Sequence, residues 1–454
     1  MKNRAPPAAI QAGFVTGSLF RHVVVMSTTG AIGLIAVFLV DLINLFYISL
    51  LGQQHLTAAI AFAGVVGFFQ VSFCIGLMIG IAAVVSRATG AGRHHDARRM
   101  ATASLVLMGA ACVVVGGTTY VFLDEILGLL GATDQTRLHA TDYLRITVAS
   151  MPVLGIGMAC SSLLRAVGDA KRSMNVTLVG ALVTAALDPI LIFVFGLDLI
   201  GAAIAVVIAR LVMAAVALHG VYRSHHLLGK FESAHFAADA RAVGQVSGPA
   251  ILANLATPFG VAFVTTFMAP FGAAAVAGMA TIDRLTPVSF GLVYALSGAV
   301  GPIVGQNLGA GRIDRVRQTL KDSLSFMAMA VGAAWLVLAL GQGYIISAFS
   351  AKGVTAELIS LFCSFLAASF VFIGALFVSN AAFNNLGKPL YSMGFNWARA
   401  SLGTIPFAYA GSHYGPIGVL VGSSLGAVIF GSLATWVAFR IIDGLERQQS
   451  ECKD

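Results

Sequence analysis

The feature that most constrains this chain is a succession of long apolar runs. About twelve such runs follow one another through the 454 residues, each near the roughly 20 residues needed to span a bilayer. A soluble domain carries about 25% charged residues, whereas only 10% of this chain is charged and 58% is hydrophobic. We therefore predict an all-α polytopic membrane protein with twelve transmembrane helices. The predicted spans lie near 23–50, 57–85, 100–123, 141–163, 174–196, 199–222, 247–270, 275–301, 323–348, 357–383, 391–411 and 416–440.

A short motif is repeated at a fixed distance along the chain. The tetrapeptide Gly-Ala-Gly-Arg occupies residues 90–93 and recurs 219 positions later at 309–312. Ordered matches at one spacing indicate an internal duplication, so we expect two six-helix lobes related by a pseudo-two-fold axis along the membrane normal. The predicted parts are an N-terminal lobe at 1–222, a cytoplasmic linker at 223–246 and a C-terminal lobe with a cytoplasmic tail at 247–454. Further matched pairs are Gly168 with Gly387 at 219 positions and Pro189 with Pro406 at 217.

Basic residues gather in alternate loops and at both termini. Of the 27 Lys and Arg, all but six lie there, from Lys2 to Lys453. Because short cytoplasmic loops are enriched in Lys and Arg, these loops and both termini are predicted to be cytoplasmic, and the chain a multi-pass protein of the inner (plasma) membrane. The net charge of +8 then reflects topology and gives no reason to expect nucleic acid as a partner.

Histidines and cysteines do not indicate a metal site. The hydrophilic connection at 221–245 contains His225, His226 and His235, but no Cys or acid keeps ligand spacing with them, and we interpret it as a solvated linker. Five cysteines, from Cys74 to Cys452, are scattered in a pattern that fits neither a disulfide framework nor a zinc site. No cofactor is therefore expected.

Two acids at lipid depth are the best candidates for chemistry. Asp41 lies well inside the first predicted span and Asp188 inside the fifth, directly before Pro189. Each costs about 2.5–3.5 kcal/mol on insertion scales, so each requires a partner or a purpose. Burial disfavours the charged form of a carboxyl group, so a buried acid can hold a proton near neutral pH and release it when water or a cation arrives. A proton-coupled carrier requires this property.

Helical spacing puts each acid on a stripe of small and polar residues. Such stripes are expected to turn away from lipid and to line a polar pocket, in which Asn44, Thr177 and Thr184 support the acids; the alternative is that the acids only fix helix packing. Pro189 removes a backbone donor and leaves a nearby carbonyl free for hydrogen bonding. The stripes are Gly30, Gly33, Val37, Asp41 and Asn44 in the first span, and Thr177, Ala181, Thr184 and Asp188 in the fifth.

The other intramembrane charges have simpler interpretations. Asp283 and Arg284 are adjacent in sequence and are interpreted as a structural pair that neutralises itself. Arg210 and Arg399 are expected to snorkel or to cap an internal acid. The repeated Gly-Ala-Gly-Arg loops are interpreted as hairpins without substrate contact, because they follow no strand and lack the Lys-Ser/Thr ending of a phosphate-binding loop.

Together these motifs resemble the multidrug and toxic compound extrusion (MATE) family over nearly the whole chain. The resemblance is carried by Asp41 followed by Leu51-Gly52, by the loop at 86–93, by Leu187-Asp188-Pro189 and by the segment at 305–312. It implies two six-helix lobes around a central cavity, alternating access, and export of cationic amphipathic compounds against inward flow of protons or sodium.

The departures from the family pattern favour its DinF-like branch. The sodium-type branch has a glutamate in the seventh span and an aspartate in the tenth, whereas here the seventh span has no acid and the tenth has none after Glu357. In the DinF-like branch an Asn commonly precedes the fifth-span Asp by four positions; this chain has Thr184, whose hydroxyl can donate and accept one hydrogen bond. The family's early proline in the first span is replaced by the stretch 26–30, which ends at the flexible Gly30.

The resulting hypothesis is a secondary active antiporter that exports organic cations or amphipathic drugs in exchange for protons, with Asp41 and Asp188 as coupling residues. It is expected to act as a monomer among membrane lipids, with sodium as an alternative coupling ion. A lipid or lipid-linked glycan flippase is a second alternative, although its cavity would carry several basic residues and the spans contain few. An enzyme is disfavoured, because the spans contain neither a His-rich metal cluster nor a nucleophile elbow.

Overall fold

The protein's structure is a computed structural model that describes residues 12–51 and 53–451. Gly52, Cys452 and the terminal basic residues Lys2 and Lys453 lie outside the described residues. Within the described ranges every regular element is a helix, and the prediction of an all-α polytopic membrane protein is confirmed.

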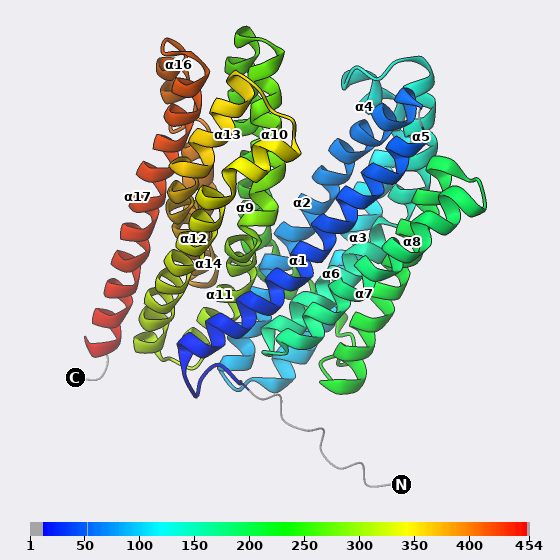
Figure 1. Cartoon of the computed structure of the whole chain (residues 1–454). Helices are drawn as coiled ribbons and strands as arrows, with labels where there is room; N and C mark the ends of the chain where they lie inside the picture. The colour runs from blue at the N-terminus through cyan, green and yellow to red at the C-terminus, as the bar shows by residue number, and fades with distance from the viewer. Residues whose placement is uncertain (1–11, 52, 452–454) are drawn as a thin grey trace. The chain divides into compact units, whose positions relative to one another are not determined.

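The described residues of the first half form eight α-helices, two of which end in a turn of π-helix; their course is drawn in Figure 1. In chain order they are α1 (Leu19–Leu50), α2 (Gln54–Gly90), α3 (His94–Val121), α4 (Leu123–Leu129), α5 (Asp134–Ala149), α6 (Met151–Ala166), α7 (Ala170–Pro189) with η1 (Ile190–Val194), and α8 (Asp198–His219) with η2 (Gly220–Ser224).

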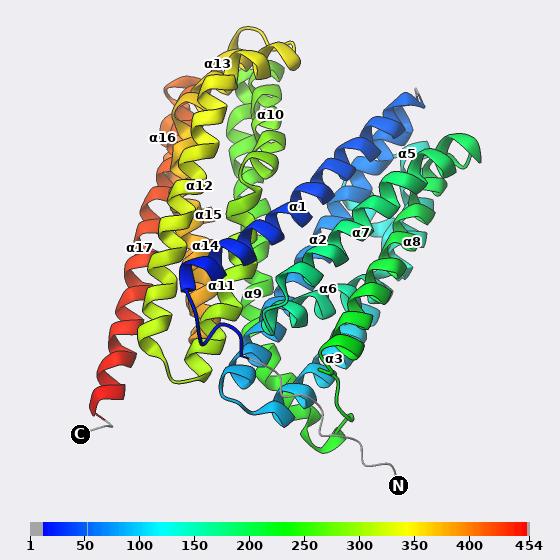
Figure 2. The same cartoon turned by 60° about the horizontal axis from the view of Figure 1, so that its bottom comes forward.

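The second half forms the remaining helices (Figures 1 and 2). They are α9 (Ser233–Met268), η3 (Ala269–Phe271), α10 (Ala273–Ser289), α11 (Gly291–Gly309), α12 (Ile313–Ala348), α13 (Val354–Ser364), η4 (Leu366–Ser369), α14 (Phe370–Asn385), α15 (Pro389–Ala400), α16 (Ile405–Ser412) and α17 (Gly415–Glu451). Helix α9 begins at Ser233, inside the stretch expected to be a solvated linker, and Gly229 before it exchanges hydrogen bonds with Thr102 on α3. The stretch is thus partly helical and hydrogen-bonded to α3, while His226 and Lys230 are exposed, and its role as a solvated linker remains a prediction.

Most of the predicted spans correspond to helices of membrane-spanning length. Within the described residues nine helices are long and apolar enough to cross a bilayer, and two bent pairs raise the number to eleven. The bent pairs are α5 with α6, at 48°, and α10 with α11, at 50°. Large apolar side chains project outward from these helices, as on α12, where Val337 and Leu340 are 71% and 76% exposed. Such a surface suits contact with lipid.

The predicted span at 391–411 is not one continuous helix. Helix α15 ends at Ala400 and α16 begins at Ile405, with Pro406 in its first turn. The residues between them pack against α17 with backbone in contact, because a Cβ added at Gly426 would collide with the backbone of Gly403. Glycines 418, 422 and 426 recur every four residues on α17; the first two face α16 and the third faces the segment before it. This is the small-residue spacing that brings membrane helices close together.

The repeated Gly-Ala-Gly-Arg motif ends a helix in each half. Helices α2 and α11 end at Gly90 and Gly309, and the next helices begin at His94 and Ile313, so both boundaries are 219 residues apart. In the first copy the Arg93 N–H donates to the Ala88 carbonyl and the Gly92 N–H to the Thr89 carbonyl; Arg312 and Gly311 repeat this pattern with Asn307 and Leu308. This is a Schellman cap, which needs a left-handed residue, and Gly92 and Gly311 have φ of 71° and 69°. Each motif is therefore a tight turn between two helices, and its lack of substrate contact remains a prediction.

Residue contacts divide the chain into two compact units. Unit 1 contains residues 32–251, and unit 2 contains 13–31 and 252–454. The division falls inside α1 and inside α9, at positions 220 residues apart. This distance is close to the 219-residue spacing of the repeat. In unit 2, Gly30 of α1 lies against Ala295 of α11; in unit 1, Gly76 of α2 lies against Ile251 of α9. The division by contacts thus differs from the predicted lobes 1–222 and 247–454, whose boundaries remain a prediction.

An ion-pair cluster ties together two connections of unit 1. Asp169, between α6 and α7, accepts hydrogen bonds from the Arg172 guanidinium at 2.8 Å and from the Arg172 backbone N–H at 3.1 Å, and lies 2.8 Å from His225 Nε2. Burial alone raises the pKa of this carboxyl, but the hydrogen bonds from His225 and Arg172 outweigh it and hold the pKa at about 2. The cluster therefore stabilises the fold while Asp169 is ionised.

Replacing Gly422 with alanine is expected to destabilise the packing of α16 on α17. The added Cβ would collide with the Phe407 carbonyl, and overpacking of this kind costs about 1–3 kcal/mol. Gly332→Ala on α12 is the matched control, because its Cβ would meet no atom within 4 Å. Thermal unfolding in detergent should show a lower melting temperature for Gly422→Ala alone; equal melting of the two variants would contradict the close packing.

Asp169→Asn is expected to lose stability in a pH-dependent way. Since the folded-state pKa lies below the unfolded value of 3.8, the ionised group stabilises the protein above about pH 4 and this stabilisation disappears as the pH falls through 2. At pH 7 the variant should lose about 1–2 kcal/mol. Unfolding measured from pH 7 to pH 2 should show the difference from wild type closing below pH 4. Asp314→Asn, whose side chain is 70% exposed, should show little difference, and a gap that is constant with pH would contradict the assignment.

Candidate functional site

Asp188 and Asn44 join α7 to α1 within unit 1. Asn44 Nδ2 donates to Asp188 Oδ2 at 2.8 Å, and the Asp188 side chain is fully buried. The other carboxylate oxygen, Oδ1, has no hydrogen-bond partner within the described residues. A buried polar atom without a partner is costly, so this oxygen is ready to accept a proton, water or a ligand group.

Asp41 lies one helical turn before Asn44 on α1. The two side chains therefore share a face of the helix, and the Asp41 carboxylate lies within electrostatic range of Asp188. Unlike Asp188, Asp41 is exposed at the surface of the molecule. Earlier on α1, a Cβ at Gly33 would come within 3.2 Å of Thr177 Cβ on α7. The two predicted stripes thus meet at two points, and the structure brings Asp41, Asn44 and Asp188 together.

Thr177 and Thr184 do not donate to this carboxylate. The Thr177 hydroxyl donates to the Ser173 carbonyl at 3.4 Å and the Thr184 hydroxyl to the Gly180 carbonyl at 3.1 Å. Both hydroxyls thus form hydrogen bonds within α7. Thr177 contributes by its contact with Gly33, whereas the amide donor to Asp188 comes from α1.

Asp188 also lies where α7 loses its regular hydrogen bonding. Pro189 lacks an N–H, and the following residues Ile190–Val194 form a π-helix in which the Phe195 N–H reaches the Ile190 carbonyl at 3.0 Å. Single π-helical turns in α-helices are frequent at functional sites, although a second such turn, η2, ends α8 away from this carboxylate. Asp188 thus lies at the point where regular α-helical hydrogen bonding ends.

Two further residues of unit 1 were not identified as site residues from the sequence. Tyr143 of α5 is partly buried and lies within electrostatic range of Asp188, Asp41 and Arg210. Arg210 of α8 donates from Nη1 to the Thr147 carbonyl at 2.6 Å and to the Ser150 hydroxyl at 2.7 Å. It thus holds the bend between α5 and α6, and the expectation that it snorkels or caps an acid is wrong. The available signal was the helical spacing of Tyr143, Thr147 and Ser150.

The intramembrane charges of unit 2 are arranged differently from expectation. Within the described residues Asp283 forms no ion pair or hydrogen bond with Arg284 or with any other residue, so the interpretation as a self-neutralising pair is wrong. Arg399 of α15 donates from Nη2 to the Thr257 hydroxyl of α9 at 3.3 Å. It caps no acid among the described residues. None of the described His, Cys, Asp and Glu side chains form a group of three or more that could hold a metal ion.

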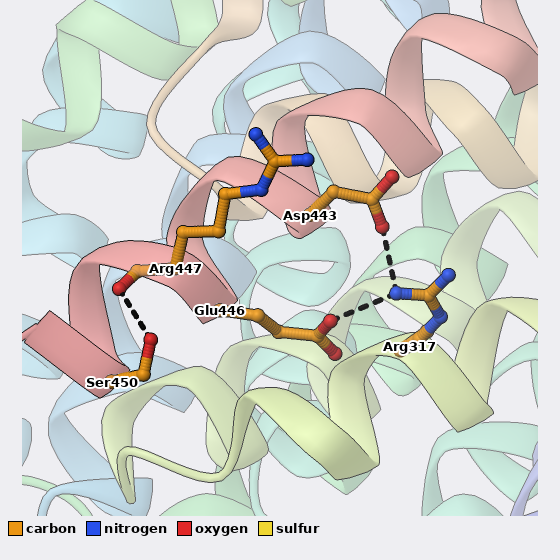
Figure 3. A pocket seen from close by; sticks show the side chains of 5 residues that line it. All are labelled: Arg317, Asp443, Glu446, Arg447 and Ser450. Atoms are coloured by element: carbon orange, nitrogen blue, oxygen red, sulfur yellow. Dashed lines mark hydrogen bonds and ion pairs between the residues drawn. The ribbon is translucent and has the colours of Figure 1, made fainter.

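A charged cavity of about 410 Å³ lies between α12 and α17 in unit 2 and contains none of the predicted site residues (Figure 3). Arg317 Nη1 donates to Asp443 at 2.7 Å and to Glu446 at 2.8 Å, while Arg447 and Ser450 complete the lining. Because its main charges pair with one another, the cavity is best explained as an ion-pair network that joins the ends of the two helices.

The fold and the buried carboxylate define a polytopic membrane transporter, and comparison with known proteins agrees. The sequence profile of the MatE family matches residues 31–190 and 249–410. The chain therefore belongs to the MatE (MATE) family. Members of this family are transporters, so the expectation that the chain is not an enzyme is confirmed.

Individual relatives match between 74% and 98% of the chain. A protein of Shewanella oneidensis named FAD transporter is 27% identical over 438 residues, 95% of this chain and 97% of the relative. The multidrug export protein MepA of Staphylococcus haemolyticus is 24% identical and covers 74% of this chain and 75% of its own length. A variant of the Vibrio cholerae MATE transporter VcmN has 25% identity, a TM-score of 0.89 and coverage of 95% and 97%. A multidrug resistance MATE transporter in an outward-facing conformation, at 20% identity, shares the fold with a TM-score of 0.91 over 98% of this chain and all of its own.

Asn44→Ala is expected to weaken the site while Thr184→Val leaves it unchanged. Removing the Asn44 amide leaves both oxygens of Asp188 without a donor, which costs about 1–3 kcal/mol, whereas the Thr184 hydroxyl bonds only to its own helix. Thermal unfolding of both variants, each with and without Asp188→Asn, forms two double-mutant cycles. Coupling to Asp188 is expected for Asn44 alone, and coupling to Thr184 of similar size would contradict the hydrogen bonding described above.

Proposed function

We propose that the protein is an antiporter that exports cationic amphipathic compounds from the cell in exchange for entering protons. The observation that carries this proposal is the buried Asp188 carboxylate, with one oxygen held by Asn44 and the other without a partner. An ionisable group at this depth is a functional site by default. Asp41, on the same face of α1 as Asn44, supplies the second acid.

The chemistry of the cycle follows from the charge of the two acids. With both carboxylates ionised, unit 1 attracts an organic cation, and the two like charges repel each other in a medium of low dielectric constant. A proton arriving from outside neutralises one acid, removes both the repulsion and the attraction for the cation, and lets the drug leave. Coupling arises because proton and drug bind the two states with different affinities, which is the only source of such coupling.

The proposed setting is the inner membrane, with the basic loops and both termini in the cytoplasm and the monomer as the working unit. The positive-inside distribution of Lys and Arg supports this orientation. The multidrug exporter MepA, related over 74% of this chain, supports drugs as the cargo. The absence of the sodium-type acids from the seventh and tenth predicted spans favours protons over sodium.

A flavin dinucleotide is a second candidate cargo. One relative that matches 95% of this chain is named FAD transporter. FAD differs from an organic cation in carrying phosphate groups, and unit 2 contains a basic side chain, Arg399, without a carboxylate partner among the described residues. Direct competition of FAD against a cationic dye distinguishes the two cargoes.

Asp41→Asn is expected to abolish proton-driven transport. The amide cannot bind or release the coupling proton, while its size leaves insertion and packing unchanged. Uptake of a fluorescent organic cation into inside-out vesicles, under an acid-inside gradient and with or without sodium, measures this directly. Wild-type uptake should require the gradient and ignore sodium, and the variant should fall to the level of empty vesicles. Asp41→Glu is the control that keeps the carboxyl group.

Other outcomes of the same assay separate the alternatives. Uptake that follows a sodium gradient would replace the proton by sodium. Uptake by Asp41→Asn equal to wild type would remove Asp41 from the mechanism. Movement of lipid-linked glycan without any gradient in both proteins would indicate a flippase.

A further inference from the structure

Unit 2 interrupts a helix at the position where unit 1 places Asp188. The fifth predicted span is irregular from Pro189 onward, and the eleventh is broken between α15 and α16 just before Pro406, which corresponds to Pro189 in the repeat. Binding sites of secondary transporters commonly lie where corresponding helices of the two halves are discontinuous. The break in unit 2 is therefore a second candidate site, although the predicted coupling acids lie only in unit 1.

The charged residue beside this second break is a cation. Arg399 is the penultimate residue of α15, and its backbone carbonyl accepts a hydrogen bond from the Thr404 hydroxyl across the break at 2.9 Å. Its guanidinium contacts Thr257 at 3.3 Å, while its Nε is buried without a hydrogen-bond partner within the described residues. A guanidinium has five N–H donors in a planar arrangement suited to carboxylate or phosphate. Among the described residues, Nη2 is the Arg399 side-chain donor for which a hydrogen bond is found, so most of the donors remain available.

Aromatic side chains of α9 and α15 pack against one another in the same part of unit 2. Trp397 is fixed by a 2.9 Å hydrogen bond from its Nε1 to the Leu252 carbonyl, and its ring lies 5.2 Å from that of Phe259. Phe259 in turn packs on Phe263 at 4.8 Å. Phe259 is 36% exposed, so part of this aromatic surface is available to a planar ligand.

A carboxylate of unit 2 lies in the same electrostatic neighbourhood. Tyr294 of α11 interacts electrostatically with both Arg399 and Asp283. Within the described part of the chain, however, these two opposite charges do not form an ion pair with each other. Asp283 is exposed and Arg399 is partly buried, and charged residues inside a span usually face a cavity or the bundle interior. Because neither charge is paired with the other, Arg399 can pair with an anionic group of a ligand and Asp283 with a cationic group.

We propose that Arg399, the aromatic surface of Trp397 and Phe259, and Asp283 form a substrate site in unit 2 for planar aromatic compounds that carry an anionic group. The carboxylate or phosphate of the ligand pairs with Arg399, its ring packs on the aromatic surface, and a cationic group, where present, pairs with Asp283. This inference rests on the proposed function in one respect: it assumes that the compound bound in unit 2 is transported. It assigns the binding of zwitterionic and anionic aromatics to named residues of unit 2.

A matched pair of dyes tests the site in the purified full-length protein. One probe is a rhodamine with a free carboxylate, and the other is its methyl ester, which keeps the cationic ring system and loses the anion. Binding to protein in lipid nanodiscs is followed by fluorescence anisotropy. The wild type should bind the free acid at least about tenfold more tightly than the ester, because only the free acid can form a hydrogen-bonded charge pair with Arg399. Equal affinities in the wild type would overturn the proposal without any variant.

Variants then assign the effect to named residues. Arg399→Gln should weaken the free acid about 10- to 100-fold and leave the ester unchanged, while Asp283→Asn should weaken both probes. Arg284→Gln, an exposed neighbour in the same unit, should change neither. Equal weakening of both probes by Arg399→Gln, in a protein that still elutes as a single species, would overturn the proposal.

Transport assays separate this inference from the proposed function. Asp41→Asn should lose gradient-driven uptake yet still discriminate the acid from its ester. If the wild type binds the acid more tightly than the ester but its uptake does not depend on the gradient, proton coupling is rejected and the unit 2 site is retained. If uptake depends on the gradient but the two dyes bind equally, the unit 2 site is rejected and proton coupling is retained.

Discussion

The requirement that every polar group at lipid depth find its partner inside the protein governs this structure. Asp188 has one oxygen satisfied by Asn44, Arg210 is satisfied by the carbonyl and hydroxyl groups at the bend between α5 and α6, and the threonines of α7 return their hydroxyls to their own helix. In water these contacts would contribute little. In hydrocarbon a missing partner costs several kcal/mol. Among the buried polar atoms without a hydrogen-bond partner within the described residues, Asp188 Oδ1 and Arg399 Nε belong to ionisable side chains in predicted spans, and a proton or a ligand would supply the missing partner there.

The duplicated architecture makes these exceptions easier to interpret. The two halves share helix boundaries 219 residues apart and end α2 and α11 with the same cap, so both use one backbone plan. At corresponding irregularities, however, the first half places an acid and the second a base. If the two proposed sites both bind cargo, a transported molecule would be held by different charges in different steps of a cycle. The backbone provides the irregular positions, and the side chains determine what binds there.

Much of this arrangement was predictable, and the exceptions share one physical cause. Apolar runs, loop charges and the repeat predict the helices, because helix formation in a bilayer depends on composition over roughly 20 residues. The stripe of Asp41 and Asn44 and that of Asp188 were predictable from the 3.6-residue period, although the pairing of Asn44 with Asp188 was not specified. The roles of Arg210, Asp283 and Thr184 were not predictable, because each depends on which atoms of another helix come within 3 or 4 Å. Sequence spacing gives the face of a helix but not the neighbour that packs on it. The break after Ala400 is a further example, because it follows from glycine contacts with α17.

Helices α1 and α9 each contribute residues to both units. Each is continuous, yet the first part of α1 packs in unit 2 and its remainder, with Asp41 and Asn44, packs in unit 1. A change in the charge of Asp188 alters its contact with Asn44 and therefore acts on a helix whose other end belongs to the second unit. A rigid helix transmits such a displacement along its axis, whereas a flexible loop would absorb it. Under the proposed function, protonation of Asp41 or Asp188 would therefore act on a helix that belongs in part to each unit, as coupling between an ion and a transported molecule requires.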